Sequence, residues 1–177
     1  MRTTRGTPVI IIDTREQKPY KFRGMDRERK GLETGDYSLK GHEDKVVVER
    51  KSHADAWDCA RGSRKRFVNC LQRLAVLPHP AIVIECTLEE LSQPTEHVIT
   101  YFNRRYSSAS RRYNSKEYIE KGIKGAIQTV VSSYISWSQQ YRIPVFFAGN
   151  RAYSERLVVK FLMSYWRHEV ICGVDYE

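Results

Sequence analysis

Residues 45–51 combine an apolar run with side chains that could do chemistry. Three valines at 46 to 48 are typical of a buried strand, and Glu49, Arg50 and Lys51 follow them directly. Because side chains alternate between the two faces of a strand, Glu49 and Lys51 are expected on one face and Arg50 on the other. The pattern therefore sets a carboxylate beside an ammonium group. Taken alone, such a pair is more simply read as the hydrophilic end of a strand.

A second carboxylate is expected close to the first. Gly35 and Asp36 open the preceding strand, and the Gly-His-Glu-Asp segment at 41–44 has the composition of a hairpin turn. Antiparallel pairing would bring Asp36 close to Glu49. Two carboxylates repel one another unless a cation lies between them, and hard oxygen ligands suit Mg²⁺ or Mn²⁺. Lys51 could then polarise a water molecule or stabilise negative charge developing on a phosphate.

Three ordered blocks surround these residues. They are Asp-Thr-Arg-Glu at 13–16, Gly-Asp-Tyr at 35–37 and Glu-Arg-Lys-Ser-His-Ala-Asp at 49–55. The sequence thereby resembles the XPF-type structure-specific nuclease domain, whose signature is GD followed by ERKxxxD, after a strand that ends in DxRE. The resemblance extends over nearly the whole chain, through a basic helix, a strand ending in Ile84-Glu85, a long helix and the segment 143–147.

The resemblance implies a role for each signature position. Asp36 and Glu49 would be metal ligands, Lys51 the catalytic lysine, and Asp13 a further acidic member of the metal and catalytic site. Supporting roles, in orienting ligands or contacting phosphate, would fall to Arg15, Glu16, Arg50 and Asp55. Structural readings stay open for these four: Arg50 could pair with a buried carboxylate, and Asp55 could be a first-turn helix acid behind Ser52.

The order of expected elements predicts an α/β fold, a mixed sheet flanked by helices, as in restriction-endonuclease-like proteins. Apolar runs predict strands at 8–12, 36–40, 45–50, 81–85 and 143–147. Helical periodicity predicts helices from 54 to just before Pro78, over 117–140 and over 153–167. Residues 92–116, which are polar with Arg, Tyr and Ser, are expected to form a long basic, aromatic-containing loop or insertion.

The length of 177 residues fits one domain, spanning 1–177. XPF-type proteins generally carry a tandem helix-hairpin-helix module after the nuclease domain, and this sequence shows none. The chain is therefore expected to be either an excised domain or a naturally minimal nuclease. The same family pairs its nuclease domains, so a homodimer or a partner subunit is expected, through an apolar face of the last two helices that includes Tyr134, Trp137, Tyr165 and Trp166.

The amino-acid composition indicates which kinds of partner the protein binds. A net charge of +9 favours a polyanionic binding partner, with nucleic acid as the first candidate and an anionic membrane surface as the second. The four cysteines are widely spaced, which argues against a zinc ribbon, and no GxxxxGK loop suggests an NTP-driven machine. Without an apolar run of transmembrane length or a signal-peptide core, no membrane association is expected. The chain is expected inside the cell, in the cytoplasm or in the nucleus or nucleoid, and not secreted.

Two basic runs are candidate DNA-binding surfaces. The first contains Arg61, Arg64, Lys65 and Arg66, and the second interleaves arginines with aromatics that could stack on unpaired bases, namely Arg104, Arg105, Tyr106, Arg111, Arg112 and Tyr113. A solvated helix face and a soluble insertion are the plainer alternatives.

These features predict a Mg²⁺-dependent DNA endonuclease that hydrolyses phosphodiester bonds in branched, flap or fork DNA, with a place in repair, recombination or replication. Two alternatives stay open. One is a non-catalytic DNA-binding scaffold of a nuclease complex, although scaffolds tend to lose the acidic residues that are present here. The other is a restriction-type, sequence-specific endonuclease, since the Asp-Glu-x-Lys core is shared.

Overall fold

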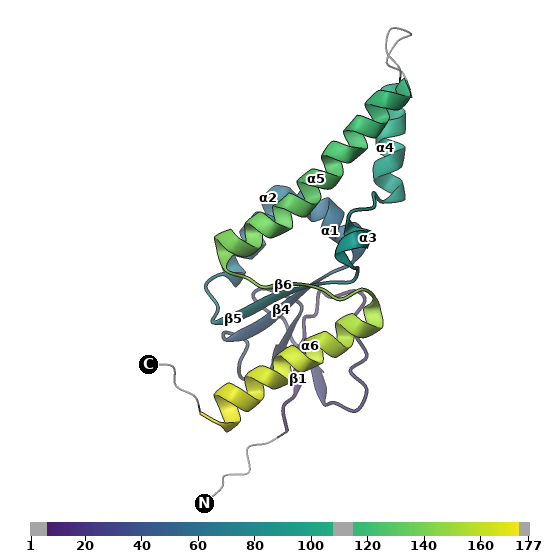
Figure 1. Ribbon diagram of the computed structural model, residues 1–177. Coiled ribbons are helices and arrows are strands. Elements are labelled where there is room, and N and C mark those ends of the chain that lie inside the picture. Colours follow the sequence, from purple (N-terminus) through teal and green to yellow (C-terminus); the bar gives the residue numbers. More distant parts are fainter. Residues whose placement is uncertain (1–6, 108–114, 174–177) are drawn as a thin grey trace, which may run out of the picture.

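The computed structural model describes residues 7–107 and 115–173 and consists of a mixed sheet with helices on both faces (Figure 1). The sheet has the order β2-β1-β3-β4-β5-β6. Its strands are β1 (Ile10–Ile12), β2 (Arg27–Arg29), β3 (Tyr37–Leu39), β4 (Val46–Lys51), β5 (His79–Ile84) and β6 (Val145–Phe147). Strands β4, β5 and β6 run parallel, whereas β3 is antiparallel to both of its neighbours. The predicted fold class is confirmed.

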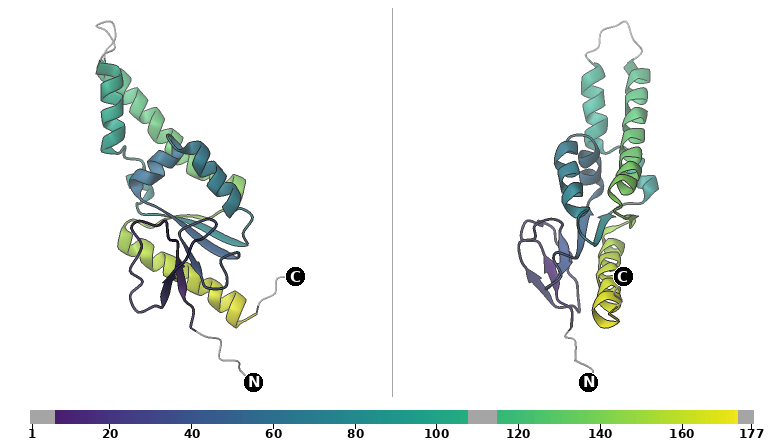
Figure 2. Two further views of the ribbon diagram at one scale, coloured as in Figure 1. Left: turned by 180° about the vertical axis from the view of Figure 1, so that it is seen from behind. Right: turned by 90° about the vertical axis from the view of Figure 1, so that its left-hand side faces the viewer.

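Helices cover the two faces of the sheet unequally (Figures 1 and 2). One face carries α1 (His53–Ala60), α2 (Arg64–Leu74) and α5 (Ser115–Tyr141), and the other carries α6 (Arg151–Tyr165), which continues as a π-helical turn, Trp166–Ile171. Alternation along β4 builds both cores: Val47 packs under α1, α2 and α5, while Val46 and Val48 pack against α6. A strand buried on both faces is thus held rigidly, and its last residues are the candidate site.

The helices on the larger face include a projecting pair. After α3 (Leu88–Leu91), α4 (Glu96–Ser107) runs beside the first half of α5, and both extend away from the sheet (Figure 2). The buried Phe102 lies against Gly122, where an added Cβ would come within 2.6 Å of the ring, so glycine permits the close approach of the two helices. Among the described residues, no helix combines the length and the apolar character needed to cross a membrane.

Three sequence expectations need correction. Residues 92–116 are not a single loop, because Glu96–Ser107 is helical and α5 already begins at Ser115; residues 108–114 lie outside the described part. In α4, the buried side chains of Val98 and Phe102 lie one turn apart and stabilise the helix by packing. The polar composition of the segment gave no sign of this helix. The helix expected from residue 54 is two helices, separated at Arg61–Ser63, where Ser63 donates a hydrogen bond to Asp58. The exposed, wholly charged strand β2 was not expected.

The face expected to pair subunits is largely core. Tyr134 and Trp137 pack with Phe67 between α5 and α2, and Tyr165 is buried against His42 and His79. These aromatics therefore stabilise the monomer fold. Whether the chain forms a dimer or has a partner subunit stays a prediction.

Gly35 allows the chain to enter β3 beside β4. Its φ is +78°, in the left-handed region, and a Cβ there would lie 2.0 Å from the Cγ1 atom of Val47. We expect Gly35→Ala to lower the free energy of unfolding by roughly 2–5 kcal/mol, from backbone strain together with overpacking. Gly41→Ala is the matched control, because Gly41 has a φ of +80° but no atom within 4 Å of the added Cβ. Urea unfolding of both variants measures the difference, and equal losses would contradict the steric account.

Candidate functional site

The carboxyl ends of β4 and β5, the start of α1 and the residue before β3 meet at one edge of the sheet. A cleft of about 880 Å³ opens there. The buried Asp13 and Glu49 do not line it, but the other signature residues do. The lining consists of Arg15, Glu16, Gln17, Lys18, Asp36, Arg50, Lys51, Ser52, Ala54, Asp55, Arg66, Glu85 and Arg151. The parallel register that pairs Lys51 with Ile84 brings the ends of β4 and β5 level, so Glu85 follows at the same edge.

Asp36, Glu49 and Lys51 are brought together as predicted. The backbone of Asp36 donates to the Val48 carbonyl over 2.9 Å, and its Oδ2 atom accepts from the Arg50 amide over 2.6 Å, so the hairpin fixes this carboxylate beside β4. Lys51 donates from Nζ to Oε1 of Glu49. The ammonium group also lies 5.2 Å from the centroid of the Phe67 ring, which gives it a favourable electrostatic contact.

The charges of Asp36, Glu49 and Lys51 change one another's pKa values. Burial and the neighbouring charge of Glu49 raise the pKa of Asp36 well above its usual range. For Lys51, burial lowers the pKa, but the charge of Glu49 and its hydrogen bond outweigh burial and raise the pKa above its usual value. Lys51 is therefore an ammonium at neutral pH. The two carboxylates repel each other, so the pair favours a bound cation.

Asp13 has a different environment. Its Oδ1 atom accepts from the amide and Nε of Arg15, and its Oδ2 atom accepts from Nη2 of Arg15 and the amide of Leu32, over 2.6–3.0 Å. Burial raises the pKa of this carboxyl, but these hydrogen bonds outweigh burial and lower it overall. The carboxylate orders the loop after β1. Its place among the metal ligands stays a prediction.

Arg50 lies on the opposite face of β4 from Glu49, as the alternation predicted. Its guanidinium binds Glu85 through two hydrogen bonds of 3.0 and 2.7 Å and lies 3.5 Å from Glu16. Arg151 completes the network by donating to Glu85 over 2.9 Å and to the carbonyls of Lys18 and Pro19. Arg50 therefore pairs with a buried carboxylate, the structural alternative left open by the sequence.

Two of these network residues were missed as site residues. Glu85 directly follows β5 and Arg151 starts α6 just after β6, so both stand beyond the carboxyl ends of strands parallel to β4. Polar residues at such positions were the available signal. A third omission is Cys70 on α2, whose thiol donates to Oε2 of Glu49 over 3.6 Å.

Asp55 belongs to the first turn of α1. Ser52 caps that helix by accepting from the Asp55 amide over 3.2 Å, and its hydroxyl donates to the Asp55 carboxylate over 2.6 Å. The carboxylate lines the cleft and stays exposed. The geometry gives Asp55 a capping role and leaves its part in chemistry a prediction.

The predicted DNA-binding residues fall into different surroundings. Arg66 lines the cleft, and Lys65 is exposed beside it on α2. Arg61 lies over the Phe102 ring at 5.4 Å, while Arg64 donates to Ser133 over 2.7 Å and so joins α2 to α5. Arg104, exposed on α4, is far along the projecting pair. Arg111, Arg112 and Tyr113 lie outside the described residues, and α4 includes Arg105 and Tyr106 in its last turns.

The donor set fits a hard divalent cation. Within the described ranges, no three His, Cys, Asp or Glu side chains form a group that could hold a metal. Asp36 and Glu49 are the adjacent pair of carboxylates, and a part for Asp13 stays a prediction. Two carboxylates suit Mg²⁺, which usually keeps several waters and takes further oxygens from substrate phosphates. Asp36 and Glu49 would hold the ion, with the basic residues of the cleft around the phosphate.

Comparisons with known proteins find a family match and two similar structures. Residues 12–161 match the model of the ERCC4 domain. XPF from Aeropyrum pernix has a similar structure, with a TM-score of 0.58 and 18% identity over 89% of this chain and 61% of that protein. The same protein in complex with DNA gives a TM-score of 0.59 and 18% identity over 92% and 67% of the two chains.

The structural likeness to the archaeal protein is partial and distant. The chain spans about three-fifths of the first archaeal relative, and at 18% identity the structural likeness shows the fold alone. A comparison with curated proteins finds no match. The family model covers most of the chain, and its start in β1 and end in α6 include the whole cleft. The chain therefore belongs to the ERCC4 domain family and has an XPF-type nuclease domain.

Proposed function

We propose that this protein is a Mg²⁺- or Mn²⁺-dependent endodeoxyribonuclease that hydrolyses phosphodiester bonds in branched, flap or fork DNA. The observation that carries the proposal is the adjacency of Asp36 and the buried Glu49, with the Lys51 ammonium hydrogen bonded to Glu49. Asp36 and Lys51 line the cleft together with further basic residues. DNA binding by a relative of the same fold, XPF from Aeropyrum pernix, supports the substrate class.

The chain's own residues have distinct tasks in this proposal. Asp36 and Glu49 would hold the cation, which would supply Lewis-acid polarisation of the phosphate and a more acidic water. Lys51 stabilises negative charge that develops on the phosphate, since an ammonium inside a partly closed site is worth more than one in water. Arg66, at the rim of the cleft, contacts the DNA backbone.

The test is cleavage of a panel of duplex, flap, splayed-arm and four-way DNA in Mg²⁺, Mn²⁺ or EDTA. We expect nicking of the branched substrates with either metal and none in EDTA, with DNA binding retained in EDTA because basic residues hold the backbone. Cleavage in EDTA would contradict the metal dependence. Binding without cleavage in any metal would favour a scaffold, and cleavage at one sequence in plain duplex would favour a restriction-type enzyme.

A further inference from the structure

Three hollows follow one another from the candidate active site to α4. The cleft reaches Ala54 and Asp55 in the first turn of α1. A middle hollow of about 560 Å³ shares these two residues and ends at His97 and Tyr101. The α4 hollow, of about 610 Å³, begins at the same His97 and Tyr101 and ends at Arg104. Because each hollow shares lining residues with the next, the three lie next to one another in a series that leads away from Lys51 and is called the groove below.

The chemistry changes along this groove. Of the described residues that line the cleft, six are basic and four acidic, which suits phosphates. Among the described residues, the lining of the other two hollows includes two arginines, Arg61 and Arg104, against three acids, Asp55, Asp58 and Glu96. A phosphate track would be basic throughout, so the far part of the groove suits a neutral group.

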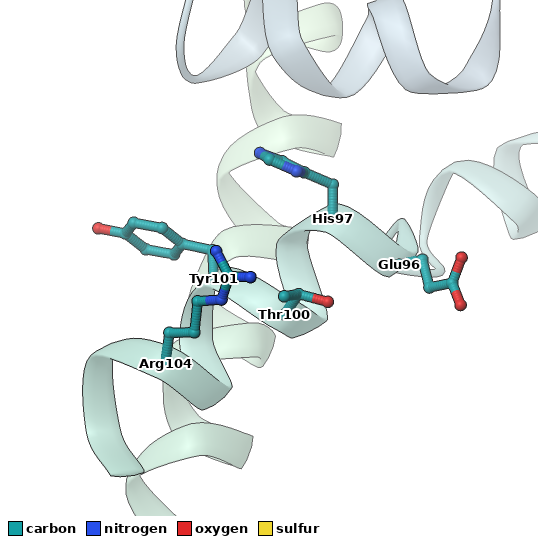
Figure 3. Close-up of a pocket in the computed structure, with 5 residues that line it drawn as sticks. All are labelled: Glu96, His97, Thr100, Tyr101 and Arg104. Atoms are coloured by element: carbon teal, nitrogen blue, oxygen red, sulfur yellow. The ribbon is translucent and has the colours of Figure 1, made fainter. Parts of the chain in front are cut away.

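The face of α4 fits such a group. Tyr101 is 45% exposed, and His97, one turn earlier, and Arg104, one turn later, are exposed on the same side. Figure 3 shows Tyr101 and Arg104 next to each other, with Glu96 pointing away. An exposed phenol ring, an imidazole and a planar guanidinium provide flat surfaces of the kind on which bases stack.

The hollow is built into the fold. Val98 and Phe102, on the other side of α4, are buried in the larger core, and Gly122 admits the Phe102 ring against α5. Arg61 covers that ring from the α1 side. The position of Tyr101 relative to the cleft is thus fixed by packing and needs no ligand to form.

We propose that the α4 hollow binds unpaired bases of the DNA strand that leads away from the cleft. The proposal rests on the proposed function and refines its substrate: DNA with a single-stranded arm next to the phosphodiester to be cut. Bases in a duplex are stacked on both faces and cannot stack on Tyr101, whereas bases of a splayed arm can. The groove thereby gives a physical means of selecting branched DNA over plain duplex.

The test measures binding in EDTA, by fluorescence anisotropy with labelled splayed-arm DNA, single-stranded DNA and plain duplex. We expect Tyr101→Ala to weaken binding of splayed-arm and single-stranded DNA about tenfold and of duplex less than about twofold, since one stacked base is worth that much. Tyr101→Phe keeps the ring and should restore affinity. His97→Ala should also weaken binding of splayed-arm and single-stranded DNA more than binding of duplex, but by a smaller factor. This second variant tests the inference even if Tyr101→Ala fails to fold.

Tyr118→Ala is the matched control, because Tyr118 is an exposed tyrosine on α5 of the same projecting pair and lines none of the three hollows. An equal loss for duplex and splayed-arm DNA, or an unchanged affinity in both Tyr101→Ala and His97→Ala, would overturn the inference. Lack of cleavage by the wild type in metal would instead overturn the proposed function, because binding in EDTA does not depend on catalysis.

Discussion

Asp36→Asn and Glu49→Gln are each expected to reduce DNA cleavage in Mg²⁺ about a thousandfold or more, with DNA affinity changed less than about twofold. Each variant removes one of the two carboxylates that fit the cation, and with the cation its polarisation of the phosphate is lost. The basic residues that hold DNA are untouched. Single-turnover cleavage at saturating DNA, beside anisotropy in EDTA, separates the two effects.

Two controls exclude trivial explanations of that loss. Asp44→Asn removes an equivalent charge from the exposed hairpin turn and should cleave like the wild type. Without metal, Asp36→Asn should melt at or above the wild-type temperature, because the charge of Asp36 is opposed by Glu49. Either active-site variant retaining half or more of the wild-type cleavage would remove Asp36 and Glu49 from the metal site.

Arg50→Met is expected to lower the free energy of unfolding by about 3 kcal/mol at pH 7, because Glu16 loses its ion-pair partner and Glu85 keeps only Arg151. The side chain of Arg50 is 9% exposed and pairs with Glu85 and Glu16, which are similarly buried. Lys40→Met is the comparison: Lys40 and its partner Glu28 are 60% and 45% exposed, so breaking this surface pair should have a much smaller effect. Urea unfolding measures both.

The pH dependence tests the cause of the Arg50 effect. Burial raises the pKa of Glu85, but the hydrogen bond and charge of Arg50 outweigh burial and lower the pKa below 4.5. In the wild type the stabilisation from this ionised pair is present above pH 4.5 and is lost as the pH falls through the lowered pKa. The deficit of Arg50→Met should therefore shrink as the pH falls below 4.5 toward the lowered pKa. A constant deficit would point to lost packing rather than lost charge pairing.

The grouping of Asp36, Glu49 and Lys51 was predictable because its geometry is local. The two-residue period of a strand sets Glu49 and Lys51 on one face, and a short hairpin brings Asp36 back to β4. The ERKxxxD spacing then predicted the family, which the ERCC4 domain match confirms.

Other parts depend on packing between distant segments. Glu85 and Arg151 meet Arg50 only because β4, β5 and β6 lie side by side in parallel, an order that no local pattern states. Helix α4 depends on the Phe102–Gly122 contact with α5, and its residues are too polar to predict a helix on their own. Strand β2 is held by backbone pairing with β1, for which side-chain periodicity gives no signal.

The charged strand β2 bears on how this protein could associate with others. An outer strand with free backbone groups is a template for another chain, and proteins commonly protect it with a short length and charged side chains. All three residues of β2 are charged and exposed, and Glu28 also binds Lys40 over 2.7 Å. Sheet extension across β2, whether in ordered assembly or in aggregation, is thereby disfavoured, so a partner on this side of the molecule would have to dock by side chains alone.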